Sequence, residues 1–467
     1  MLRLLIVGVL LLAACTSPSP PPKGDYLGLL KFPTITYHIY LDWQGALPVV
    51  KNVTFKAEEF SLDTIYVQDD SLHFRLKDFY SEYRGLYNHT THHITGQWIG
   101  EDSTTYPLDF VPALGDTISG LHPRNSPTYS YQLPPQENDG INCGTLNNQN
   151  INPIAIDSLV NRIADGRYSD IHSLLVARNN MLVVEEYFYR YNRERVYNIQ
   201  SATKSIVSAL VGISIEKGEI KSVNETLCAN LPGYQSLACN AENKDITLHQ
   251  LLTMSTGIPW DEQTYDYTDN RNSLVVAAND PDQFVHLLSQ PYVSSPTPVF
   301  AYNSLNHILM NAVLKKATHL ENKEELETRL LKPLGIEKTY ISEPTPMGAI
   351  GDIGLRPRDM LKFGLLYLND GVWNSQQVVP ARWVKVSTTS KIQPTPTLGY
   401  GYFWWTRDFQ WKGKSVSSFF AWGYGGQYIF ILPEVRLVIV MSGSKWTTDP
   451  EGQAMDIVNE ILAAAEK

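Results

Sequence analysis

Hydrophobic and polar positions alternate with a period of two in the first part of the chain, between Leu27 and Ala113. The runs TITYHIYLDW, NVTFKAEEF, DSLHFRLKDF and HHITGQWIG show this alternation, and polar turns separate them. A period of two is typical of strands that bury one face. The pattern therefore predicts a small, all-β antiparallel domain over residues 27–113.

The next stretch has a different composition. Residues 114–140 are rich in Gly, Pro, Ser and Asn, which are the residues that interrupt regular structure. We expect this stretch to be an extended linker between two domains.

From residue 141 onward, strand patterns stand at both ends of a helical middle. SLLVARNNMLVVEEYFY predicts two strands joined by an Asn-Asn turn, and a helix that begins at Ser201 ends at Lys217-Gly218. ITLHQLLTM, SLNHILMNAVLKKAT and RDMLKFGLLYLND read as helices, LGYGYFWWT, SVSSFFAWG, GQYIFILP and RLVIVMSG as strands, and DIVNEILAAAEK as a final helix. Residues 141–467 should thus form an α+β (α/β sandwich) domain, with one antiparallel sheet built from both ends, flanking helices and an inserted helical subdomain.

Composition and charge narrow the function classes. The 467 residues are 43% hydrophobic and 18% charged, which is enough apolar material for a core and argues against a disordered chain. The formal net charge is -10, whereas nucleic-acid binders concentrate Lys and Arg. We therefore expect no nucleic-acid partner.

The N-terminal segment has the features of an export signal. Arg3 precedes an apolar run, Leu4–Leu12, that is too short to span a bilayer, and small residues lead to Cys15. Leu12-Ala13-Ala14-Cys15 resembles a bacterial lipobox, and residues 16–26 form a Pro/Ser-rich tether. We expect residues 1–15 to be a lipoprotein signal peptide, although an ordinary cleaved signal peptide is the alternative.

This interpretation predicts a location. Lipid on Cys15 would hold the protein at the periplasmic face of the bacterial cell envelope, and Thr16, which is not an Asp, favours the outer membrane.

The other three cysteines fit an exported protein. Cys228 and Cys239 bracket the short loop ANLPGYQSLA, so a disulfide between them is a candidate. Cys143 is left over, either as a buried thiol or as the true partner of one of the two. No pair has metal-site spacing, and the His-rich run His89–His93 reads better as a solvated turn than as a metal site.

Ser201 and Lys204 are the first candidates for chemistry. Residues three apart share a helix face, so the Ser201 hydroxyl and the Lys204 amine can come within hydrogen-bond reach. A partly deprotonated amine there could take the serine proton, and the helix N-terminus could stabilise an oxyanion. The spacing alone is weak, because Ser and Lys are ordinary helix residues.

Several motifs in order make the case stronger. SATKSIVSALVGISIEKGEI, ITLHQLLTMSTGIPWDE, FAYNSLNHILMNAVL, GDIGLRPRDMLKFGLLYLNDGVWNSQQVVPARWV and FFAWGYGGQYIFILPE follow one another. Together they resemble the serine β-lactamase and penicillin-binding-protein superfamily, in the class C-like branch that also contains D-aminopeptidases, esterases and 6-aminohexanoate-dimer hydrolase.

That resemblance assigns roles to the first two motifs. It implies that Ser201 is the acylated nucleophile, Lys204 its base or base partner, and Tyr302 a phenol that helps to pass the proton. Relatives more often have Y-x-N at the second motif, whereas Ser304 stands at its third position here. Ser304 is therefore only a candidate substrate contact.

The third motif departs further. Where many relatives have K-T-G or H-x-G, this chain has Ala421, Trp422 and Gly423, followed by Tyr424. By resemblance, the backbone N–H groups of Ser201 and Tyr424 form the oxyanion hole. The cationic side chain is missing, as in relatives of the 6-aminohexanoate-dimer hydrolase type.

Other positions complete the expected site. Trp422 and Gly423, together with Trp260 and Asp261, are candidate substrate contacts, although aromatic residues are first of all core material. Arg356 or Arg358 could replace the missing cation.

The sequence thus predicts a metal-free and cofactor-free serine hydrolase that acts on a small-molecule or short-peptide ester or amide, with weak or absent β-lactamase activity. The alternative is a catalytically silent protein that binds or senses cell-wall peptides.

Overall fold

The computed structural model describes residues 23–31, 36–43, 45–52, 58–60, 62–77, 81–100, 103–113, 129–168, 170–189, 191–231, 233–265, 267, 269–290, 299–342, 350–444 and 452–466. Contacts within the chain divide it into two units, Met1–Leu121 and His122–Lys467. This boundary falls inside the expected linker. The signal peptide and Cys15 lie outside the described residues.

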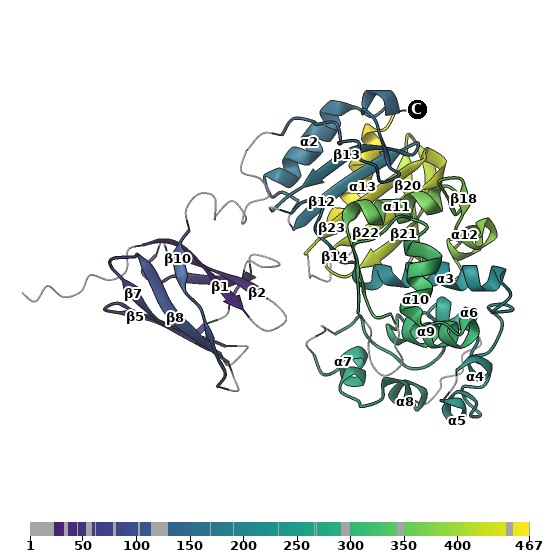
Figure 1. The fold of residues 1–467 in the computed structure, drawn as a ribbon, viewed down its shortest axis with the longest axis horizontal. Helices are drawn as coiled ribbons and strands as arrows, with labels where there is room; N and C mark the ends of the chain where they lie inside the picture. Colours follow the sequence, from purple (N-terminus) through teal and green to yellow (C-terminus); the bar gives the residue numbers. More distant parts are fainter. Residues whose placement is uncertain are drawn as a thin grey trace, which may run out of the picture. The chain divides into compact units, whose positions relative to one another are not determined.

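The smaller unit is an antiparallel sheet with the strand order β4-β3-β2-β1-β10-β8-β7-β6-β5, and β9 pairs with β8 (Figure 1). Its strands are β1 (Gly24–Lys31), β2 (Thr36–Trp43), β3 (Val49–Asn52), β4 (Glu58–Glu59), β5 (Leu62–Gln68), β6 (Ser71–Leu76), β7 (Glu82–Asn88), β8 (His93–Ile99), β9 (Thr105–Pro107) and β10 (Phe110–Pro112). The first strand begins at Gly24, which pairs with Trp43, so the expected tether is wrong over its last three residues.

The core of the smaller unit combines aliphatic side chains with a group of packed aromatic rings. The Tyr83 ring stacks on Phe74, with centroids 5.0 Å apart, and meets Phe110 edge to face at 5.1 Å. A Cβ atom at Gly85 or Gly96 would lie 2.2 or 2.4 Å from the Tyr83 hydroxyl oxygen. The two glycines therefore make room for a buried tyrosine between neighbouring strands.

The larger unit is built on a sheet with the order β11-β13-β12-β23-β22-β21-β20-β19. Its strands are β11 (Asn142–Cys143), β12 (Ile171–Arg178), β13 (Met181–Tyr187), β19 (Gly399–Tyr400), β20 (Trp405–Trp411), β21 (Lys414–Gly423), β22 (Gln427–Leu432) and β23 (Leu437–Gly443). All neighbours are antiparallel except β11 and β13. Figure 1 shows β12 (blue) beside β23 (yellow), so both ends of this unit contribute to one sheet, as predicted.

Smaller pairings accompany this sheet. One has the order β14-β16-β15, from Tyr197–Asn198, Ile353–Leu355 and Tyr340–Ile341, and the other joins β17 (Val372–Trp373) to β18 (Gln376–Gln377).

Helices fill the rest of the larger unit. The described helices are α2 (Pro153–Ala164), α3 (Thr203–Glu216), α4 (Leu227–Asn230), α5 (Gln235–Ala238), α6 (Leu248–Leu252), α7 (Ser273–Ala278), α8 (Gln283–Leu288), α9 (Leu305–Thr318), α10 (Asn322–Leu326), α11 (Pro357–Leu368), α12 (Ala381–Ser387) and α13 (Gly452–Ala464), with short turns η1 (Asn147–Gln149), η2 (Gln200–Ala202), η3 (Glu327–Leu331) and η4 (Pro433–Val435). Those from α4 to α10 form the helical subdomain, which is inserted between the two groups of strands in the sequence and lies below the sheet in Figure 1.

The central strands are covered on both faces, because every residue of β12, β22 and β23 is buried. Helix α11 packs closely on this sheet at Gly364. A Cβ atom there would lie 2.6 Å from Val438 and 2.9 Å from Ile429. Amphipathic packing on a buried sheet is what fixes the position of the helices around it.

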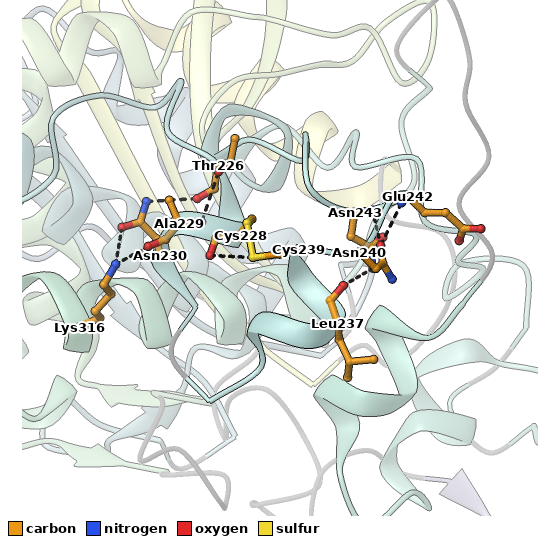
Figure 2. Close-up of a disulfide and its surroundings, with 10 residues drawn as sticks. All are labelled: Thr226, Cys228, Ala229, Asn230, Leu237, Cys239, Asn240, Glu242, Asn243 and Lys316. Carbon is orange, nitrogen blue, oxygen red and sulfur yellow. Dashed lines mark hydrogen bonds between the residues drawn. A yellow bond between two sulfur atoms is a disulfide. The ribbon is translucent and has the colours of Figure 1, made fainter.

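Cys228 and Cys239 are joined by a disulfide, which closes the loop between α4 and α5 (Figure 2). The Cα atoms are 4.7 Å apart. Lys316 of α9 donates hydrogen bonds to the Ala229 carbonyl and the Asn230 side chain beside it. Cys143 is a free, partly buried thiol, and burial raises its pKa.

The second half of the expected linker packs on the larger unit. The Tyr129 amide donates to Asn161 Oδ1 at 2.8 Å, and its hydroxyl donates to Glu186 at 2.6 Å. Arg358 donates to the Pro135 carbonyl at 2.8 Å. The expectation of an extended connector is therefore wrong over this part, because the buried Tyr129 anchors a segment whose composition alone is typical of a loop.

No helix within the described ranges is both long and apolar enough to cross a bilayer.

Candidate active site

Ser201 lies on the short turn η2, immediately before helix α3. The residue before it, Gln200, has a φ of 52°, in the left-handed region that non-glycine residues rarely adopt. The Asn198 side chain accepts a hydrogen bond from the Gln200 amide at 2.7 Å and donates to Asp352 at 3.1 Å. This pairing holds the strained turn that presents the serine.

Lys204 lies on the first turn of α3 and is only 2% exposed. Its Nζ atom is 2.8 Å from Ser201 Oγ and 3.3 Å from Ser304 Oγ. Thus the i, i+3 spacing in the sequence becomes a direct contact between the amine and the hydroxyl, inside a helix that is buried almost all round.

Tyr302 supplies a ring beside this amine. Lys204 Nζ lies over the Tyr302 ring, 5.0 Å from the centroid, a cation–π geometry. The ring stacks on Trp405 with a centroid separation of 6.0 Å. Tyr302 is 8% exposed, so its ring stands at the edge of the core, beside Lys204.

Glu262 is a buried carboxylate that accepts hydrogen bonds from Ser304 and from neighbouring side chains. Its Oε2 atom accepts from the Ser304 amide and from Trp260 Nε1, both at 2.8 Å, and its Oε1 accepts from Ser304 Oγ and from the Tyr267 hydroxyl, the latter at 3.3 Å. Sequence reasoning missed Glu262, although it directly follows the two residues of the PWDE stretch that were expected to line the site.

His307 fixes the start of α9 behind Ser304. Its ring nitrogens face the Ser304 carbonyl at 2.5 Å and the Gly351 carbonyl at 3.2 Å. Burial, with a further contribution from the Lys204 charge, lowers the His307 pKa to about 3. The neutral ring carries one N–H, which donates to one of these two carbonyls, so His307 anchors the start of α9 and is not a proton carrier at neutral pH.

The end of β21 lies against the backbone that leads to Ser201. A Cβ atom at Gly423 would stand 2.1 Å from the Ile199 carbonyl oxygen, so only glycine fits there. Tyr424 is the next residue. The two chain segments that carry the expected oxyanion-hole amides are thus in contact.

Aromatic side chains surround the strand end. Trp422 meets Trp405 at 5.2 Å between centroids, and Tyr424 meets Tyr267 at 5.2 Å. Both Trp422 and Tyr424 are partly exposed, whereas Ala421 is 1% exposed and offers only a methyl group. The described side chains at this strand end are therefore aromatic or small and suited to apolar groups.

Trp260 and Asp261 differ in their placement. Trp260 reaches the site network through Glu262. Asp261 instead accepts a hydrogen bond from the Thr264 amide at 3.0 Å, and its own amide donates to Ser273 at 2.9 Å. The structure thus uses Asp261 to shape a turn and gives it no contact with the serine, the lysine or the tyrosine.

The two arginines considered as replacement cations are both committed to acids. Arg356 pairs with Asp359 at 2.7 Å. Arg358 is 4% exposed and bonds to Glu185 at 2.7 Å and to Asp139 at 2.9 Å. Neither guanidinium is available to hold a substrate carboxylate without breaking a buried or half-buried ion pair.

Within the ranges that the structure describes, no group of three or more His, Cys, Asp or Glu side chains is arranged to hold a metal ion. The His-rich run forms the turn after β7, where His89 pairs with Asp70 at 2.7 Å and His92 with the Tyr87 hydroxyl at 2.7 Å.

Comparisons with known proteins agree with this architecture. An uncharacterized protein of Alkalihalophilus pseudofirmus is 22% identical over 305 residues, covering 60% of this chain and 85% of that protein. A Bacillus anthracis structure, named as a candidate 6-aminohexanoate-dimer hydrolase, superposes with a TM-score of 0.55 at 21% identity, over 72% of this chain and 90% of that chain. The structure of EstCE1, described as a hydrolase with promiscuous acyltransferase activity, gives a TM-score of 0.51 at 14% identity, over 67% and 97%.

At these identities the solved structures establish a shared fold. A family model described as Beta-lactamase matches residues 171–464, which include the turn that carries Ser201, the helical subdomain and the last strands. The chain therefore belongs to the Beta-lactamase family of hydrolase folds.

Proposed function

We propose that this protein is a serine hydrolase that forms an acyl-enzyme on Ser201 from small neutral esters or amides. The observation that carries the proposal is the 2.8 Å contact between Lys204 Nζ and Ser201 Oγ. A nucleophile and a base within hydrogen-bond reach, with the base held by further groups, is the general signature of covalent catalysis by serine.

The proposed reaction uses the contact between Lys204 and Ser201, and it takes the roles of Tyr302 and of the Tyr424 amide from the resemblance of the motifs. Neutral Lys204 takes the hydroxyl proton as Ser201 Oγ bonds to the substrate carbonyl carbon, and the amides of Ser201 and Tyr424 stabilise the resulting oxyanion. Collapse of this intermediate breaks the bond to the leaving group, which receives the proton with the help of Tyr302. Water repeats the sequence to release the acid and to restore the serine.

The preference for neutral substrates rests on charge. Ala421 replaces the cation that the third motif carries in many relatives, and Arg356 and Arg358 are engaged in ion pairs. Ser304 also contacts the Glu262 carboxylate directly. These features disfavour a substrate carboxylate next to the scissile bond, and the aromatic side chains at the end of β21 favour apolar acyl or leaving groups. The names of the two solved relatives, a candidate 6-aminohexanoate-dimer hydrolase and a hydrolase with promiscuous acyltransferase activity, support hydrolysis in general.

We also propose that the enzyme works at the periplasmic face of the cell envelope, tethered by lipid on Cys15, with the outer membrane favoured. This part rests on the sequence Leu12-Ala13-Ala14-Cys15 and on the Pro/Ser-rich stretch after it.

Steady-state hydrolysis of p-nitrophenyl acetate tests the proposal. Ser201→Ala and Lys204→Ala should each lower kcat/KM by roughly 10³-fold or more, and the double variant should be no worse than the single ones, because the two side chains act as one unit. Normal turnover by Ser201→Ala would rule out the assignment. A wild-type chain that binds acyl compounds without turning any over would support the silent binding protein instead.

A further inference from the structure

The Glu262 carboxylate accepts four hydrogen bonds from the side chains and backbone around Ser304. Two donor-only groups, the Ser304 amide and Trp260 Nε1, both point at Oε2 of Glu262. The hydroxyls of Ser304 and Tyr267 point at Oε1. An ionised carboxylate has room for all four of these donors, so the charged form of Glu262 fits the site without any other partner.

The Ser304 hydroxyl connects the Glu262 carboxylate to the Lys204 amine by hydrogen bonds. A hydroxyl has a single hydrogen, and a lysine amine that contacts it at 3.3 Å acts as the donor. The Ser304 hydrogen is then free for Glu262 Oε1, which it contacts directly. The result is a directed chain from Lys204 through Ser304 to Glu262.

We propose that Glu262 is a positioning residue that acts through Ser304: it fixes Lys204 against Ser201 and stabilises the ammonium that forms when Lys204 takes the serine proton. This inference rests on the proposed function. The inference also explains how Ser304 can stand where many relatives have Asn. Glu262 accepts the Ser304 hydrogen, so the hydroxyl oxygen stays oriented as an acceptor for the Lys204 amine.

The other titratable groups around the amine do not account for such an effect. His307 stays neutral, since burial lowers its pKa to about 3. Burial raises the pKa of Tyr267 and of Tyr400, which face Glu262, so both remain protonated. Tyr302 presents its ring to Lys204. Glu262 is the carboxylate that reaches the amine through a hydrogen-bonded side chain.

Glu262→Gln tests the role, because it keeps the shape and removes the charge. The carboxylate contacts Ser304 Oγ, which lies 3.3 Å from Lys204 Nζ, so its loss should weaken the stabilisation of the ammonium that forms during proton transfer. We expect the pH profile of kcat/KM for Glu262→Gln to move to lower pH than the wild-type profile, by on the order of one pH unit. We also expect kcat for p-nitrophenyl acetate to fall by roughly tenfold or more while KM changes little, since the charge acts on the proton transfer.

Two further variants distinguish a role of Glu262 in positioning Lys204 from a role in folding alone. Ser304→Ala breaks the chain to Lys204 but leaves the Glu262 charge in place, so it should lower kcat with a smaller displacement of the profile. Glu325→Gln is the matched control, because Glu325 is a fully buried glutamate that contacts the same helix α3 through Ser214. Its pH profile should coincide with that of the wild type.

A Glu262→Gln profile that superimposes on the wild-type profile would overturn the inference, as would a loss confined to KM or one matched by Glu325→Gln. A wild-type chain inert toward esters is a different result, which would count against the hydrolase proposal itself.

Discussion

Ala421 is uncharged at the third-motif position where many β-lactamases carry a cationic side chain. Its side chain is buried at the end of β21, where the resembling enzymes carry a Lys or His that holds the substrate carboxylate. A charged hydrogen bond of that kind contributes about 1.5–3 kcal/mol. A methyl group supplies none of it.

We therefore expect poor turnover of cephalosporins. Loss of the charged bond corresponds to roughly a 10- to 150-fold loss in kcat/KM. The measurement is kcat/KM for a chromogenic cephalosporin and for p-nitrophenyl acetate under the same conditions. Cephalosporin turnover at about 10⁵ M⁻¹s⁻¹ or faster would show that another cation does this work.

The buried Glu325 side chain should make the stability of the fold depend on pH. Burial raises its pKa from 4.5 to about 7, against a smaller opposing effect of Arg329, and its Oε2 atom has no hydrogen-bond partner. Because the folded-state pKa lies above the unfolded value, this group stabilises the fold fully below about pH 4.5, and the contribution is lost as pH rises through about 7. The loss amounts to about 3 kcal/mol.

Glu325→Gln should remove this dependence. Thermal unfolding of the two proteins between about pH 5 and 8 is the measurement, and the variant should gain Tm relative to the wild type as pH rises. Parallel curves for the two proteins would mean that Glu325 is solvated or paired more fully than its surroundings suggest.

At the scale of elements, the site depends on the contact between the end of β21 and the turn before α3. Gly423→Ala would place a methyl carbon 2.1 Å from the Ile199 carbonyl oxygen, so one of the two segments must move. A displacement of about 1 Å between catalytic groups can cost about 10²-fold in rate. We expect kcat/KM to fall by roughly 10- to 100-fold, with a loss of stability of about 1–3 kcal/mol.

Ser417→Ala is the control for this variant, because Ser417 is an exposed small residue on the same strand. It should change neither quantity. Full activity in Gly423→Ala would show that the strand end does not form the oxyanion hole.

The same elements show what the sequence could predict. Ser201 and Lys204 meet because helix geometry fixes i, i+3 neighbours, and the Asn179-Asn180 turn joins β12 to β13 because both residues adopt positive φ. Glu262 could not be found this way, since its partner Ser304 lies 42 residues further along the chain. Contacts of that kind depend on tertiary packing, which no local pattern encodes.

At the scale of the whole molecule, the chain combines two units with separate cores. The composition of residues 114–140 indicates the boundary between them but not the docking of the second half of that stretch. That docking depends on single buried contacts such as the one between Tyr129 and Glu186.

We predict that the whole protein is anchored to a membrane through lipid on Cys15. If Cys15 carries lipid, the wild type should fractionate with membranes, and Cys15→Ser should be released as a soluble form. Fractionation followed by mass analysis of the mature N-terminus is the measurement. A soluble wild type with its N-terminus at another residue would contradict the lipoprotein interpretation.

The central claim is that Ser201 carries the acyl group. Intact-protein mass spectrometry after mixing with a panel of esters and amides, followed by peptide mapping, tests it most directly. The account predicts a transient acyl adduct that maps to Ser201 and is absent from Ser201→Ala. An adduct on another residue, or hydrolysis that continues in Ser201→Ala, would contradict it.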